Sequence, residues 1–220
     1  MAARQLVLEL PHRPALGRED FLVAPSNQAA VTWIDRWPNW PAPGLVLFGP
    51  PGSGKSHLAA VWQAQSGATV VSHSALARGR VEARRFVFED GAAALRDPAA
   101  AEAFFHLYNR VAAEGGHMLL TGVTPPARWR TPLADLRSRL KALPVAEIQA
   151  PDDAMLAGLF AKLFRDRQLR VSGEVVLYLV HRIERSFAAV ARAVEVLDRA
   201  SLVERRRITL ALARTALDLT

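Results

Sequence analysis

A glycine-rich segment at residues 49–56 has the spacing of a phosphate-binding loop. It reads Gly-Pro-Pro-Gly-Ser-Gly-Lys-Ser, matches the pattern G-x-x-x-x-G-K-[ST], and directly follows the apolar run at 45–48. In such a loop the glycines let backbone N–H groups turn toward phosphate oxygens, Lys55 supplies an ammonium group, and Ser56 offers a hydroxyl to Mg²⁺. We therefore expect the chain to bind ATP or ADP. The motif leaves open whether the nucleotide is hydrolysed or only held.

Two acids follow another apolar run further along the chain. Residues 86–88 read Phe-Val-Phe and lead directly into Glu89 and Asp90. A carboxylate at the tip of a strand near a phosphate loop can hold Mg²⁺ and its waters, so we expect a metal site made by Ser56, Glu89 and Asp90. The alternative is a strand that ends in a charged turn. The pattern does not say which acid holds the metal and which orients water.

Arg137 and Arg139 are candidates for a basic residue that acts on a neighbouring subunit's nucleotide. Such a residue stabilises the charge that develops on a transferring phosphoryl group. Residues two apart do not share a helix face, so the two arginines cannot both reach one γ-phosphate if this segment is helical. Ordinary surface arginines are the alternative.

The elements around these residues alternate between strands and helices. Apolar runs predict strands at 45–48, 69–71, 85–88 and 117–121, and helical spacing predicts helices at 27–37, 55–65 and 99–113. Strands that alternate with helices imply a parallel sheet covered by helices, and hence an α/β nucleotide-binding domain at residues 18–149.

After Ile148 the pattern becomes helical throughout. Asp152 is placed to cap a first helix, further helices are expected around residue 179 and from about Ser186, and a short last helix starts near Thr209. Residues 150–220 are therefore predicted to form a small α-helical lid domain.

Composition excludes several classes of protein. The chain has no cysteine, so disulfides, thiolate catalysis and zinc-cysteine sites are ruled out. No run of eighteen apolar residues exists and the N-terminal sequence lacks a secretory signal pattern, so we expect a cytoplasmic protein without a membrane partner. The net charge of +7 favours anionic partners, although a basic solvated surface is the commoner explanation of such a charge.

Several short motifs, taken together, resemble the bacterial replication initiator DnaA and its truncated homologue Hda. They lie at residues 20–23, 26–30, 49–58, 107–110, 120–126, 138–140 and 197–201. The resemblance spans nearly the whole chain and implies an AAA+ module, that is, a P-loop α/β domain with a helical lid. It also implies that Phe21, Leu22, Val23 and Asn27 flank the adenine.

The remaining roles come from the same resemblance. It makes Arg139 an arginine finger, presented to ATP that is bound by the partner DnaA and promoting its hydrolysis. The nucleotide-binding set becomes Phe21, Leu22, Val23, Asn27, Gly49, Pro50, Pro51, Gly52, Ser53, Gly54, Lys55, Ser56, His57, Arg185 and Arg192.

Three positions depart from the family pattern. Glu89 stands where relatives have aspartate, Val123 where they have an acidic sensor, and Ala188 where the lid's phosphate-sensing arginine sits. Arg185 and Arg192 lie three before and four after Ala188, so we expect them to share its helical face and either one to reach the nucleotide in its place. A solvated basic face is the alternative. The loss of two sensors predicts a nucleotide that is held as an effector and hydrolysed poorly.

The first residues form an arm, 1–17, that ends in proline and glycine. Gln5, Leu6, Leu8 and Leu10 resemble the peptide by which replication proteins dock on the DNA polymerase III beta sliding clamp. Such a peptide would be extended, with leucines in an apolar groove. A first strand of the fold is the alternative.

Two other functions remain compatible with the sequence. One is a DNA-binding initiator or helicase-loading factor that uses the arginines at 205–207, although we expect no C-terminal helix-turn-helix because the sequence ends soon after the lid. The other is an autonomous ATPase or small-molecule kinase. Non-specific DNA contact and a homodimer are left open.

Overall fold

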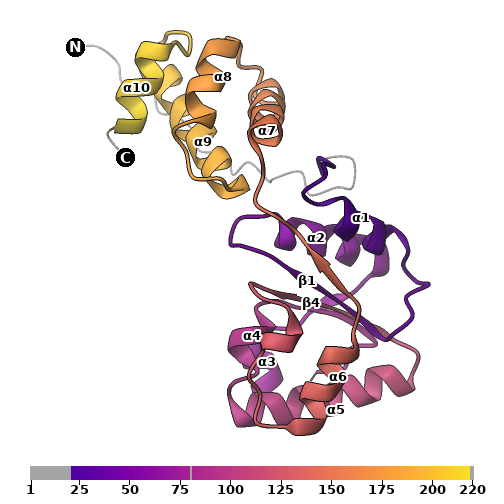
Figure 1. Cartoon of the computed structure of the whole chain (residues 1–220). Helices are drawn as coiled ribbons and strands as arrows, with labels where there is room; N and C mark the ends of the chain where they lie inside the picture. The colour runs from indigo at the N-terminus through magenta and orange to yellow at the C-terminus, as the bar shows by residue number, and fades with distance from the viewer. Residues whose placement is uncertain (1–20, 80, 219–220) are drawn as a thin grey trace.

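The computed structural model describes residues 21–79 and 81–218. The predicted clamp-binding arm at 1–17, with Gln5, Leu6, Leu8 and Leu10, lies outside the described residues. The described chain forms an α/β domain and a helical domain joined by an extended segment (Figure 1).

A five-stranded parallel sheet is the centre of the α/β domain. Its strands are β1 (Gly44–Phe48), β2 (Thr69–Val70), β3 (Arg85–Phe88), β4 (His117–Gly122) and β5 (Val145–Glu147). They lie in the order β2-β3-β4-β1-β5, and every neighbouring pair is parallel. The four predicted strands and the parallel sheet are confirmed. β5 was not predicted because it has no apolar run: only Ala146 is buried in it.

Helices cover both faces of the sheet. One face carries α1 (Gln28–Asp35) and α2 (Lys55–Ser66), and the other carries α3 (His73–Ala77), α4 (Gly91–Ala94), α5 (Pro98–Ala113) and α6 (Ala134–Ala142), with a 3₁₀ turn at Pro126–Arg128. Side chains of β1 alternate between these faces, as strand geometry requires. Leu45 and Leu47 pack with α1 and α2, while Val46 packs with α5 and α6. The strand is therefore buried on both sides, which explains its continuous apolar sequence.

Four helices with a core of their own form the lid. They are α7 (Asp153–Asp166), α8 (Gly173–Val180), α9 (Phe187–Glu204) and α10 (Leu210–Asp218). Asp152 caps α7 by accepting a 2.7 Å hydrogen bond from the Met155 N–H, and Ser186 caps α9 through the Ala189 N–H at 3.0 Å. Both helix starts agree with the sequence-based prediction. No helix within the described ranges is long and apolar enough to cross a membrane.

Candidate functional site

The predicted phosphate loop connects the carboxyl end of β1 to the first residue of α2. Gly54 precedes the helix in a left-handed conformation and offers no side-chain cap, so the first N–H groups of α2 face the loop. Gly49 must lack a side chain, because a Cβ there would lie 2.0 Å from the Ile148 carbonyl oxygen. The geometry is that of a backbone cradle at the positive end of a twelve-residue helix.

Lys55 bends back over this cradle. Its ammonium donates hydrogen bonds to the carbonyl oxygens of Gly49 at 2.8 Å and Pro50 at 2.7 Å. Burial lowers the pKa of Lys55, and the negative charges of Asp90 and Glu89 oppose this shift. The two acids are therefore close enough to the lysine for their charges to act on it.

The acidic pair lies just past β3, with both side chains exposed. Asp90 adopts a left-handed conformation, and its N–H donates a 3.2 Å hydrogen bond to the hydroxyl of Thr121. Thr121 is buried near the end of β4, where it pairs with Leu47 of β1. The hydroxyl thus fixes the backbone of Asp90 at the edge of the sheet that carries the phosphate loop.

Thr121 is a residue that sequence reasoning missed as a site residue. A polar side chain near the end of a buried apolar strand was the available signal. By contrast Val123, at the expected sensor position, lies beyond β4 and is 51% exposed. The hydroxyl that contacts the backbone of Asp90 thus comes from two residues earlier in the chain than Val123.

The segment predicted to flank the adenine is held in place by Asn27. This side chain is buried, donates to the Leu22 carbonyl at 2.8 Å and accepts from the Ala24 N–H at 2.9 Å. Phe21 packs edge-on against His57 of α2, with ring centroids 5.1 Å apart. Val23 is exposed. Both hydrogen bonds of Asn27 serve the loop, so its role in this structure is to position the loop.

The lid touches the phosphate loop directly. The Phe187 N–H, at the start of α9, donates a 2.9 Å hydrogen bond to the Gly52 carbonyl. A Cβ on Gly52 would lie 2.3 Å from the Cβ of Ser186, and a Cβ on Gly54 would meet the rings of Phe187 and Phe21. The segment predicted to flank the adenine, the phosphate loop and the start of α9 therefore meet at one place. The sequence did not identify Ser186 and Phe187 of the lid as part of this site.

The predicted lid arginines form ion pairs within the lid. Arg185 pairs with Asp153 at 2.7 Å and Arg192 with Glu184 at 4.0 Å. The expected helical face shared by Arg185 and Ala188 is wrong, because Ser186 caps α9 and leaves Arg185 outside the helix. Ala188 itself is exposed in the first turn.

Arg139 lies near the end of the helix that connects β4 to β5. α6 runs from the carboxyl edge of the sheet toward the amino end of β5, and Arg139 is in its last turn. Its guanidinium stacks on two rings of α5, 5.4 Å from the centroid of Phe105 and 5.7 Å from that of Tyr108. Burial raises the pKa of Tyr108 and the charge of Arg139 opposes the rise. Arg137 is also exposed on α6, but no ring among the residues that the structure describes makes such a contact with it.

The residues present fit a magnesium nucleotide. Among the described residues no group of three or more His, Cys, Asp or Glu side chains could hold a metal by itself. Mg²⁺ at a phosphate loop does not need one, since phosphates and waters supply most ligands. The Ser56 hydroxyl in the first turn of α2 and the two acids past β3 are the available protein oxygens.

Comparison with known proteins gives a family for the lid. Residues 153–217 match the family described as "Hda, lid domain".

Comparison of the whole structure gives the fold. Domain III of the Thermotoga maritima replication initiation protein DnaA is similar with a TM-score of 0.79 and 17% identity, covering 95% of this chain and 98% of that chain. AMPPCP-bound DnaA from Aquifex aeolicus gives 0.74 and 16%, covering 87% and 67%. The Thermotoga maritima RuvB Holliday junction branch migration motor gives 0.66 and 16%, covering 88% and 66%.

These likenesses are those of AAA+ domains, and they confirm the predicted fold class. At sequence identities this low the solved structures establish the fold alone, and the lid match identifies the family of the C-terminal domain. Residues 153–217 thus match the Hda lid-domain family, and the described chain as a whole has the fold seen in DnaA domain III.

Proposed function

We propose that this protein is a nucleotide-bound negative regulator of replication initiation. It docks on the DNA polymerase III beta sliding clamp through Gln5, Leu6, Leu8 and Leu10 and supplies Arg139 to ATP bound by DnaA, which promotes hydrolysis of that ATP. The Hda-type lid and the DnaA-like fold support a DnaA-related regulator.

The position of Arg139 carries the proposal. It lies in the last turn of α6, away from the edge of the sheet where its own phosphate loop lies. It is exposed, yet the rings of Phe105 and Tyr108 hold its guanidinium in one place. A fixed and accessible guanidinium that cannot serve its own site suits a site on another subunit.

The protein's own nucleotide has a structural role in this proposal. Lys55, Ser56 and the loop N–H groups hold phosphates, Glu89 or Asp90 completes the Mg²⁺ shell, and Phe21, Leu22 and Val23 border the base. Mg²⁺ would neutralise phosphate charge there. Because Arg185 and Arg192 are engaged by acids of the lid, neither is poised to act on a γ-phosphate, which favours slow turnover.

The decisive test compares two arginines of one helix. Arg139→Ala should reduce clamp-dependent stimulation of DnaA-bound ATP hydrolysis to the rate of DnaA alone, a loss expected to reach about 10³-fold. Arg137→Ala removes the same charge two residues away and serves as the matched control. Clamp pull-down should be unchanged in both variants and lost in Gln5→Ala. If Arg139→Ala and Arg137→Ala stimulate hydrolysis of DnaA-bound ATP equally, Arg139 is not the arginine finger.

One observation favours the alternative of an autonomous ATPase. The Thr121 hydroxyl keeps a polar group beside Asp90 at the edge of the sheet. Steady-state ATP turnover by the isolated protein distinguishes a regulator of DnaA from an autonomous ATPase. A turnover rate above roughly 1 s⁻¹, in the lower range for enzymes, would favour the ATPase.

A further inference from the structure

A groove at the end of the lid is lined by four arginines. It holds about 360 Å³ and lies between the loop that follows α7 and the loop that joins α9 to α10. The lining residues are Gln168, Leu169, Arg170, Ser201, Arg205, Arg206, Arg207 and Ile208, and none of them is acidic. The groove is distinct from the phosphate loop, which the opposite end of α9 approaches.

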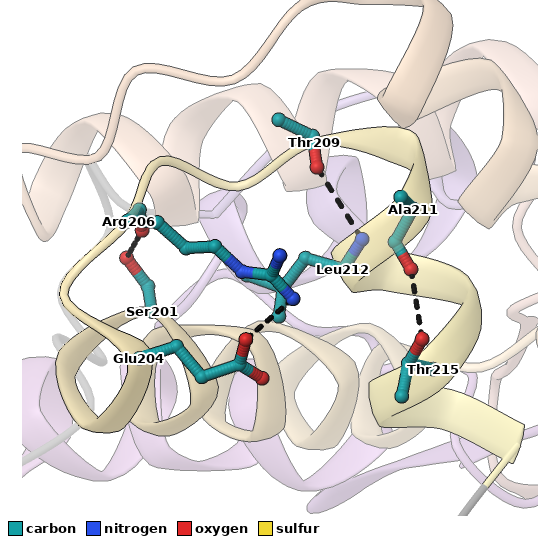
Figure 2. Close-up of polar contacts among 7 residues, drawn as sticks. All are labelled: Ser201, Glu204, Arg206, Thr209, Ala211, Leu212 and Thr215. Atoms are coloured by element: carbon teal, nitrogen blue, oxygen red, sulfur yellow. Dashed lines mark hydrogen bonds and ion pairs between the residues drawn. The ribbon is translucent and has the colours of Figure 1, made fainter.

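The loop that carries three of these arginines is fixed at both ends. Ser201 accepts the Arg206 N–H through its carbonyl at 3.2 Å and donates its hydroxyl to the Arg206 carbonyl at 2.7 Å. Thr209 then accepts the Leu212 N–H at the start of α10 (Figure 2). Ile208, buried in the lid core, anchors the loop between them. The arginines therefore extend from a rigid support.

Three carboxylates near these loops in the sequence have cationic partners, and one of those partners is Arg206 of the groove itself. Asp166 pairs with Lys162 at 3.0 Å and Asp198 with Arg167 at 3.7 Å, while Glu204 pairs with Arg206, as Figure 2 shows. Within the described part of the chain, neither Arg170 nor Arg207 has an ion-pair partner. Both are exposed. The guanidinium groups of Arg170 and Arg207 therefore add positive charge to the groove without a paired carboxylate, and this creates a positive potential that an anion would relieve.

We propose that this groove binds the phosphodiester backbone of nucleic acid, independently of base sequence. Guanidinium groups match phosphate oxygens with two parallel hydrogen bonds, and all four cations of the groove are arginine. An acidic peptide fits less well, because peptide binding relies on apolar anchors and the apolar lining residues are buried Ile208 and half-buried Leu169. This proposal does not depend on the proposed action on DnaA.

The experiment measures binding of the full chain to a fluorescent duplex of about 20 base pairs over a range of salt, with excess ADP present to occupy the phosphate loop. Arg170→Gln/Arg207→Gln removes the two arginines without an ion pair. Each lost phosphate contact lowers the salt slope by about 0.9, so the double variant should lose close to 2. Its affinity at low salt should fall by about 10-fold to 100-fold, since each contact is charge-assisted.

The control is Arg78→Gln/Arg128→Gln, which removes two exposed arginines of the α/β domain. It should keep the slope of the unmodified protein. Each single variant of the groove should lose about 1 from the slope, which tests the proposal even if the double variant folds poorly. No binding by the unmodified protein, equal losses in groove and control variants, or equal displacement by polyglutamate or by inorganic phosphate at matched charge would each overturn it.

Discussion

Replacing Gly52 by alanine tests the contact between lid and phosphate loop. Gly52 has φ +70°, and an alanine Cβ would lie 2.3 Å from the Cβ of Ser186. Two costs follow. The left-handed conformation costs alanine roughly 1–2 kcal/mol, and the overlap with Ser186 adds roughly 1–3 kcal/mol as long as the lid stays in place. If the lid moves away instead, the hydrogen bond from Phe187 is lost, at about 1 kcal/mol.

Gly67→Ala provides the matched control. Gly67 has nearly the same φ, +68°, but a Cβ there would meet nothing within 4 Å. It should therefore lose only the conformational part, roughly 1–2 kcal/mol. The difference between the two variants isolates the contact with the lid, and we expect Gly52→Ala to be the less stable by about 1–3 kcal/mol.

Urea unfolding measures both free energies. All five tryptophans precede residue 149, so their fluorescence follows the α/β domain, while circular dichroism follows both domains. Adding Ser186→Gly to Gly52→Ala should restore most of the extra loss, because glycine at an N-cap costs only a few tenths of a kcal/mol. If the two alanine variants lose the same free energy of unfolding, or if Ser186→Gly does not restore the extra loss, Ser186 does not lie as close to Gly52 as the structure places it.

Three further predictions concern stability and turnover. Burial lowers the pKa of His117 below 6.5, so the unfolded chain binds the proton at a higher pH than the folded chain does. The free energy of unfolding should therefore be highest above about pH 6.5 and should decrease as the pH falls toward the lowered pKa. Urea unfolding at about pH 7.5 and about pH 5.5 should show this decrease, and His117→Gln should show a smaller one. Asp152→Ala removes the cap bond to Met155 and should cost the lid about 1 kcal/mol in thermal unfolding followed by circular dichroism, whereas Asp152→Asn should cost less. Thr121→Val removes the acceptor of the Asp90 N–H and should cost about 1 kcal/mol in urea unfolding and lower any residual ATP turnover, whereas Thr121→Ser should preserve both.

The parts of the site that sequence alone predicted are local. The phosphate loop depends on its own glycines and on the helix that follows, and the caps at Asp152 and Ser186 depend on the next three residues. The contact of Ser186 with Gly52 depends instead on how two domains pack, which no spacing within either segment encodes. The helical face predicted for Arg185 was wrong for a related reason, since the cap at Ser186 leaves Arg185 outside α9.

The orientation of Arg139 shows how one missed element affects a functional argument. In a parallel sheet each connecting helix must return from the carboxyl edge to the amino edge, so residues late in that helix lie away from the phosphate loop. This rule applies to α6 only if a strand follows it, and β5 has a single buried residue and no apolar run. Without β5 the direction of Arg139 was undetermined, and only the resemblance singled it out from Arg137. With β5 paired to β1, the chain connection itself directs Arg139 away from its own phosphate loop.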